Sequence, residues 1–175
     1  MDSTYDAVWT AMTDVLANTT PELGTEIAYQ MQLWLGSLSS LGLSSNAATG
    51  IAGAINSLLT GKSDIGDQER TLLAMAAAKS NMSFADLLVN GVGSGADMSK
   101  FMLGVVTTLQ DIYTESKDNN VLLSEWGSLL NLSIADWKAI SNLSANSLAT
   151  IAAQSGYSRA SAMNEEHYIE NNLVA

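Results

Sequence analysis

A short segment, NMSFADLL at residues 81–88, recurs fifty residues later as NLSIADWK at residues 131–138. Each copy opens on an asparagine, which tolerates the left-handed conformation that ends many helices. A serine, a preferred N-cap, follows two residues later, and an aspartate three residues beyond it gives the pattern of a capping box. The residues are Asn81, Ser83 and Asp86 in the first copy and Asn131, Ser133 and Asp136 in the second. Each copy therefore predicts that one helix ends and another begins, which concerns folding rather than catalysis.

Apolar residues flank each capping serine at the positions of a hydrophobic staple. Met82 and Leu132 precede the serines, and Leu87 and Trp137 lie four residues after them. Side chains at these two places pack against each other and fix the angle at which the chain starts the helix. The repeated segment thus predicts two similar helix starts.

The rest of the chain shows apolar stripes of helical spacing, separated by caps and polar breaks. Pro21 follows Thr20, which suits an N-cap before a proline at the first helical position, and KDNN at 117–120 ends the longest periodic run. That run has the spacing of a coiled-coil seam over two heptads, for which core packing is the favoured use; its members are Met98, Met102, Val105, Leu109 and Ile112. Helices are expected at about 121–130, 133–141 and 145–155. Strand-like alternation is absent, so we predict an all-α fold, an array of about eight to nine short capped helices with no sheet.

Residues 27–61 form a stretch of 35 positions without a charged side chain. A membrane-spanning helix needs about 20 predominantly apolar residues, but GSLSSLGLSSNAATG interrupts this stretch. The pattern favours two buried or self-associating helices, with membrane contact as the weaker alternative. Gly50, Ala54 and Ser57 form a small-residue face that predicts close helix contact, and Gly61 is expected to cap the second helix. We predict an N-terminal helical part at 1–62 and a C-terminal helical part at 63–175, with one continuous helical domain as the alternative.

The charge balance restricts the partners of this chain. Seven basic and eighteen acidic residues give a net charge of −11 and a pI near 4.1. No cluster of lysine or arginine lies among aromatic residues, so we expect no specific nucleic-acid binding. The chain has no cysteine, which excludes disulfides and thiolate metal sites. The first fifteen residues lack a basic region, so no signal peptide is predicted.

Two places in the sequence bear residues that catalysis or metal binding could use. His167, the single histidine, has Glu165, Glu166 and Glu170 beside it, but catalytic zinc needs three protein ligands in fixed geometry. A solvated polar helix face is the favoured interpretation of this cluster. The Glu115–Ser116 pair resembles that of lytic transglycosylases, although the following KDNN departs from that family. We therefore predict no catalytic residue, no metal site and no enzymatic activity.

Other candidate binding loops fail on their context. GVGSGADMSK at 91–100 has three glycines before a helix, but it follows a helix rather than a strand, so a helix C-cap and hinge are favoured over a phosphate-binding loop. Segments 64–69 and 118–125 miss the calcium-loop pattern and are expected to be exposed turns. No cofactor is predicted.

Two further features have interpretations within a helical fold. The four tryptophans, which we expect to be core or interface anchors, are Trp9, Trp34, Trp126 and Trp137. LSSNAATGIA at 43–52 and LSANSLATIA at 143–152 share several residues at an offset of 100. A chain so rich in serine, alanine and leucine produces such matches by chance, and no regular period makes this a repeat protein.

From about Lys79 onward the order of elements resembles internal segments of phage tail tape measure proteins. The similarity lies in a helix ending in LQDIY, a polar break, a helix leading to LSIADWKAISNL, an Ala/Ser-rich connection and EEHYIENNL. It covers residues 79–175 and includes no catalytic signature. Tape measure proteins are usually several times longer, so the resemblance implies an internal segment, a split product or a short relative.

The resemblance implies a largely helical, non-enzymatic tail protein. Such proteins occupy the tail lumen of the virion, set tail length during assembly and leave before DNA passes; they are made in the host cytoplasm. The implied partners are other phage tail proteins, or further copies through helix faces. The main alternative is a small soluble helical module that binds a protein partner. An enzyme using Glu115 or His167, and a membrane-active segment at 27–61, rank below both.

Overall fold

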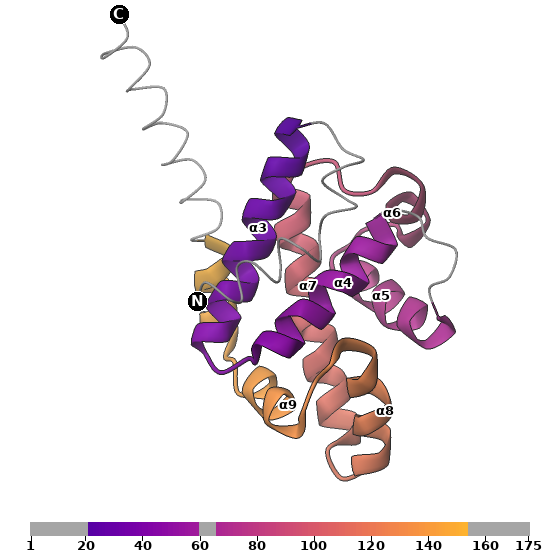
Figure 1. The fold of residues 1–175 in the computed structure, drawn as a ribbon, viewed down its shortest axis with the longest axis vertical. Helices are drawn as coiled ribbons and strands as arrows, with labels where there is room; N and C mark the ends of the chain where they lie inside the picture. The colour runs from indigo at the N-terminus through magenta and orange to yellow at the C-terminus, as the bar shows by residue number, and fades with distance from the viewer. Residues whose placement is uncertain (1–20, 60–65, 154–175) are drawn as a thin grey trace, which may run out of the picture.

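The computed structural model describes residues 21–59 and 66–153 (Figure 1). These residues form helices joined by short turns, with no strand among them, which confirms the all-α prediction. The helices are α3 (Pro21–Ser40), α4 (Ser45–Leu59), α5 (Asp67–Lys79), α6 (Phe84–Asn90), α7 (Gly95–Ser116), α8 (Asn120–Leu130) and α9 (Ile134–Ser141), and a last helical segment spans 145–153. The three helices predicted at about 121–130, 133–141 and 145–155 agree with this order within the described residues.

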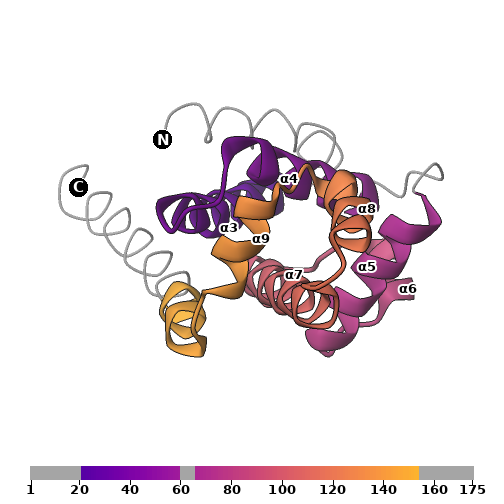
Figure 2. The same ribbon diagram turned by 90° about the horizontal axis from the view of Figure 1, so that it is seen from below.

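Helix α7 is the longest described helix and lies at the centre of the packing. It contacts α3, α5, α8 and α9, and Figure 2 shows it end-on among them. The seam predicted along it, from Met98 to Ile112, is buried in one continuous core. The seam is therefore used for core packing, as expected, and residues distant in sequence share that core with it.

Two glycines allow helices to approach closely. A Cβ at Gly104 of α7 would overlap Ser80 and the backbone of Ala76 at the end of α5, and a Cβ at Gly50 of α4 would overlap the Leu130 carbonyl at the end of α8. The close contact predicted for the small-residue face is thus confirmed at Gly50. Each glycine lies against the last turn of a helix that leads into one of the repeated segments.

The helices begin and end close to the positions predicted from the sequence. Helix α3 begins at Pro21, and the chain between α7 and α8 is non-helical at 117–119. Gly91, with φ of 68°, is the C-cap of α6 as predicted. Thr20, Gly61 and the segment from residue 158 lie outside the described residues.

One expectation about loops was wrong in part. Asp67 and Glu69, assigned to an exposed turn at 64–69, belong to the acidic first turn of α5. Likewise the segment 118–125 is helical from Asn120 onward. In both places acidic or amide side chains lie at a helix start, where they favour the helix by capping it or by complementing its dipole.

Candidate functional site

Asp136, in the first turn of α9, accepts four hydrogen bonds through its side chain. The residue is 2% exposed. Oδ2 accepts hydrogen bonds from the backbone N–H and hydroxyl of Ser133, at 2.9 and 3.0 Å. The Asp136 N–H donates to Ser133 Oγ at 3.1 Å, so the capping box predicted from the sequence is complete at this copy.

The same carboxylate also binds the start of α4. The Ser44 N–H donates to Oδ1 at 2.8 Å and the Ser44 hydroxyl donates to Oδ2 at 2.9 Å. Ser44 in turn accepts the Ala47 N–H at 3.1 Å, so it serves as the cap of α4. One carboxylate thus joins the starts of two helices whose caps lie far apart in the sequence. We call this contact the Ser44–Asp136 joint.

Burial and hydrogen bonding act on this carboxyl group in opposite directions. Burial, the largest single influence, raises the pKa of Asp136 because it penalises the charged form. The hydrogen bonds from Ser133 and Ser44 stabilise the ionised form and together outweigh burial. The pKa of Asp136 is therefore lowered from its ordinary value of 3.8, and the group is ionised at neutral pH. The two oxygens of Asp136 already accept four hydrogen bonds, so this carboxylate holds the starts of α4 and α9 together.

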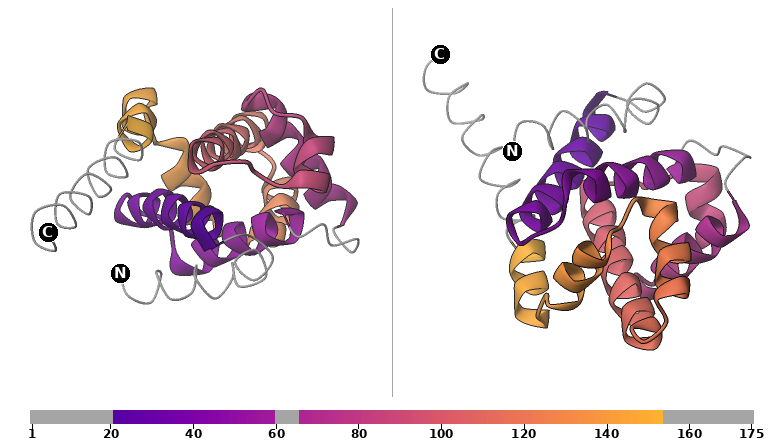
Figure 3. Two further views of the ribbon diagram at one scale, coloured as in Figure 1. Left: turned by 90° about the horizontal axis from the view of Figure 1, so that it is seen from above. Right: turned by 60° about the horizontal axis from the view of Figure 1, so that its bottom comes forward.

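An apolar contact accompanies the joint. Leu38, Leu41 and Leu43 at the corner between α3 and α4 face Ala139, Ile140 and Leu143 of the α9 region, and the space between them is too small to hold a water molecule. A Cβ at Gly42, whose φ is 118°, would lie 3.3 Å from the Ala139 Cβ. Figure 3 shows α9 lying between the end of α3 and α8. The corner and α9 therefore meet through both a polar and an apolar contact.

The first copy of the repeated segment has a different environment. Ser83 caps α6 and accepts the Asp86 N–H at 3.3 Å, which is the forward half of a capping box. Asp86 is exposed, and within the described residues its carboxylate accepts no hydrogen bond. Asn81 and Asn131 both adopt the predicted left-handed conformation, with φ of 56° and 59°. The two copies agree in backbone and differ in what covers them.

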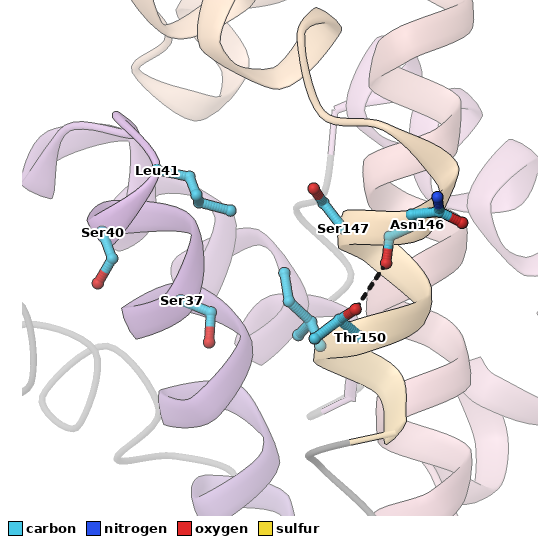
Figure 4. Close-up of a pocket in the computed structure, with 7 residues that line it drawn as sticks. Ser37, Ser40, Leu41, Asn146, Ser147 and Thr150 are labelled. Atoms are coloured by element: carbon cyan, nitrogen blue, oxygen red, sulfur yellow. Dashed lines mark hydrogen bonds between the residues drawn. The ribbon is translucent and has the colours of Figure 1, made fainter.

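A groove of about 400 Å³ lies between the end of α3 and the helical segment 145–153 (Figure 4). Its walls carry Ser37, Ser40, Leu41, Asn146, Ser147, Thr150 and Ile151. The Thr150 hydroxyl donates to the Asn146 carbonyl at 2.8 Å. Leu41 is 50% exposed, and Figure 4 shows its side chain directed into the groove. The groove has hydroxyl and apolar groups but no charged side chain in its lining.

The remaining residues considered from the sequence are dispersed. Glu115 is exposed and Ser116 is buried at the end of α7. Trp34 and Trp137 are fully buried, as expected, and their indole N–H groups donate to Ser99 Oγ at 2.9 Å and to the Leu123 carbonyl at 3.2 Å. The half-buried Trp126 packs against the core.

The other candidate residues from the sequence either lie outside the described residues or have a structural contact. Trp9, His167, Glu165, Glu166 and Glu170 lie outside the described residues. Gly95 begins α7, and its N–H donates to Glu26 of α3 at 3.2 Å. In residues 21–59 and 66–153, no group of three or more acidic, histidine or cysteine side chains is arranged to hold a metal ion.

Sequence reasoning missed the Ser44–Asp136 joint. The sequence indicated Asp136 as part of the capping box of its own helix, but gave no sign that it also meets the cap of α4. No helix in the described part of the chain combines the length and the apolar character that crossing a membrane requires. Comparison of the chain with protein-family models, with curated proteins and with solved structures finds no match.

Proposed function

We propose that this chain is a non-enzymatic, tape-measure-like component of a phage tail. In this role it takes part in tail assembly and occupies the tail lumen of the virion before DNA ejection. The observation that carries the proposal is the order of elements from residue 79 onward. A long helix ending in LQDIY, a polar break, a short helix, a capped turn and LSIADWKAISNL follow one another as in tape measure segments.

The fold limits how the chain could measure length. A straight helix rises about 1.5 Å per residue, but the described helices pack around α7 instead of lying end to end. We infer that the chain is stored as a folded body. A ruler role would require these helices to open into a line, which the net charge of −11 would favour through self-repulsion.

The first test asks where the protein is. Virions of the phage that encodes the chain would be analysed by mass spectrometry before and after DNA release is triggered. We expect the chain in intact tails and its loss from tails that have ejected DNA. Absence of the chain from intact tails would refute the proposal.

A second measurement separates a ruler from a plug in the lumen. Deletion of α5 and α6, Asp67 to Asn90, would shorten a fully helical ruler by about 36 Å, measured as tail length in electron micrographs. As a control, insertion of an unrelated helical sequence of equal length at the same place should restore the length. Unchanged tails with the chain still present would support lumen occupancy without length setting.

The exposed apolar side chains favour a second candidate, a helical module that binds a protein partner. Val89 and Val121 are 81% and 71% exposed, and such side chains are typical anchors in helix-face recognition. On this hypothesis the chain is absent from virions, and Val89→Ser or Val121→Ser weakens binding to a defined partner without lowering the melting temperature. Loss of virion assembly in those variants would favour the first candidate instead.

A further inference from the structure

Helices α5 and α6 form a hairpin, residues 67–90, on one side of the molecule in both Figure 1 and Figure 2. The hairpin contacts α4 and α7, but few large apolar side chains hold it there. Three of its large apolar side chains are buried, namely Leu72, Leu73 and Leu87. Helix α7, of 22 residues, buries seven: Met98, Phe101, Met102, Val105, Val106, Leu109 and Ile112. Because apolar burial is the main attraction between packed helices, the hairpin is held less firmly than its length suggests.

The contact between α5 and α7 is close but largely polar. A Cβ at Gly104 would overlap the Ser80 hydroxyl, so the two helices meet without a large side chain between them at this point. The Ser80 hydroxyl donates to the Lys100 carbonyl at 3.0 Å, and Lys79 forms an ion pair with Asp111 while both side chains remain about half exposed. Water can replace such hydrogen bonds when the helices separate, and an exposed ion pair adds little stability. These contacts therefore align the hairpin on α7 without binding it tightly.

Thr108 adds an unfavourable group to the same face of α7. It follows Gly104 by four residues, which places the two on one side of the helix. The residue is fully buried, and its hydroxyl has no hydrogen-bond partner among the described residues. A helical threonine often donates to the carbonyl four residues earlier, but the Gly104 carbonyl already accepts the Thr107 hydroxyl at 3.1 Å. Burying an unpaired hydroxyl costs free energy, and that cost is recovered when water reaches it.

The linker from α6 to α7 offers a place to bend. Gly91 has φ of 68° and ψ of −154°, a backbone conformation that is almost exclusive to glycine. Glycine also passes between conformations more readily than other residues. The next residue, Val92, is 3% exposed and belongs to the core. Rotation at Gly91 would therefore move the hairpin while the rest of the linker stays anchored.

We propose that the α5–α6 hairpin is a lid that opens as a unit from α4 and α7, with Gly91 as its hinge. Opening hydrates the Thr108 hydroxyl and uncovers the faces of α4 and α7 that the hairpin contacts. Proteins open in such cooperative units at a lower free energy than that of complete unfolding, and the least apolar contacts open first. The proposal does not depend on a role in phage tails.

Native-state hydrogen exchange of the full chain, read by mass spectrometry at urea concentrations below the unfolding transition, tests the lid. Helices as short as α5 and α6 are marginal on their own, so their amides lose protection when the lid opens. We expect the α5 and α6 amides to exchange together, at least about tenfold faster than those of α7. Their rates should rise with urea less steeply than those of α7, because lid opening exposes less surface than unfolding. Equal rates in α5 and α7, or fast exchange of α6 alone, would overturn the proposal.

A pair of neighbouring variants tests the part played by the buried hydroxyl. Thr108→Val keeps the shape of the side chain and removes the unpaired hydroxyl, so it should slow exchange of the hairpin amides by about tenfold. Thr107→Val removes a hydroxyl that has partners and should not slow it. If Thr108→Val slows exchange in α7 and leaves the hairpin unchanged, the hydroxyl stays dry until the whole body unfolds, and the proposal fails. Melting curves of both variants confirm that the compared proteins are folded.

Discussion

The turns at 81–83 and 131–133 have nearly the same backbone, yet they have different environments. Each follows a helix whose last turn lies in close contact with a glycine of another helix. This glycine is Gly104 in the first case and Gly50 in the second. Each contains a left-handed asparagine. The aspartate that follows is exposed in α6 and fully hydrogen-bonded in α9. The comparison teaches that the local sequence sets the turn, whereas the topology decides whether the turn becomes a joint.

The largest difference in stability between the two copies is expected for substitutions at the fourth helical position, Trp137 in α9 and Leu87 in α6. Trp137→Ala should lower the free energy of unfolding by about 4 kcal/mol, because it removes a fully buried ring. Leu87→Ala, at the equivalent place in α6, should cost about 2.5 kcal/mol. Urea unfolding followed by circular dichroism measures both. Trp137→Phe, which keeps most of the volume but loses the hydrogen bond to Leu123, should fall between wild type and Trp137→Ala.

The next largest loss of stability is expected for substitutions at the Ser44–Asp136 joint. Asp136→Ala should cost about 3 kcal/mol, because it leaves the part-buried N–H groups of Ser44 and Ser133 without their acceptor. Asp86→Ala should cost less than about 1 kcal/mol, the usual contribution of an exposed acid in a first helical turn. Equal losses in the two variants would show that the Ser44 contact adds nothing. In that case Ser44→Ala should cost only the about 1 kcal/mol of a lost N-cap.

Acid gives a milder way to weaken the same joint. Because the pKa of Asp136 is lower in the folded chain than its ordinary value of 3.8, this group adds stability above that value. The added stability is lost as the pH falls below 3.8 through the folded pKa. Urea midpoints measured from pH 6 down to pH 3 should fall more steeply in wild type than in Asp136→Asn. Parallel pH profiles in the two proteins would contradict this account.

The smallest effect should be the same in both copies. Asn81→Ala and Asn131→Ala each replace a residue that tolerates the left-handed region with one that tolerates it less, so each should cost about 1 kcal/mol, whereas glycine at either place should be close to neutral. Thermal melts of the four variants test this. A clear difference between the two alanine variants would show that the covering of the turn also affects its backbone.

Short-range features of the fold could be predicted from the sequence. The left-handed asparagines, the capping serines and the buried stripe of α7 depend on residues within a few positions of one another, and the structure confirms them. The first turn of α5 was assigned to a loop because its acidic residues resemble those of a turn as much as those of a helix start. Local pattern alone does not separate these two uses.

Long-range contacts could not be predicted in this way. The capping box of α9 involves only Oδ2 of Asp136. No residue near Asp136 in the sequence indicates which group binds Oδ1. The contact with Ser44 appears only when α4 and α9 are placed in space. The same holds for Gln110 of α7, whose side-chain amide donates to the carbonyls of Ile140 and Leu143, at 3.1 and 2.9 Å, beyond the end of α9. Its position in a polar gap of the α7 stripe gave no sign of this role.

The separation of 92 residues between Ser44 and Asp136 has a consequence for the newborn chain. A ribosome adds about 5–20 residues per second, so Asp136 is made roughly 5 to 18 seconds after Ser44. During that interval the start of α4 has no carboxylate to bind, and Leu38 and Leu43 have no α9 to cover them. The corner between α3 and α4 is thus exposed for seconds before its partner is made, and exposed apolar surface of this kind is prone to aggregation during synthesis.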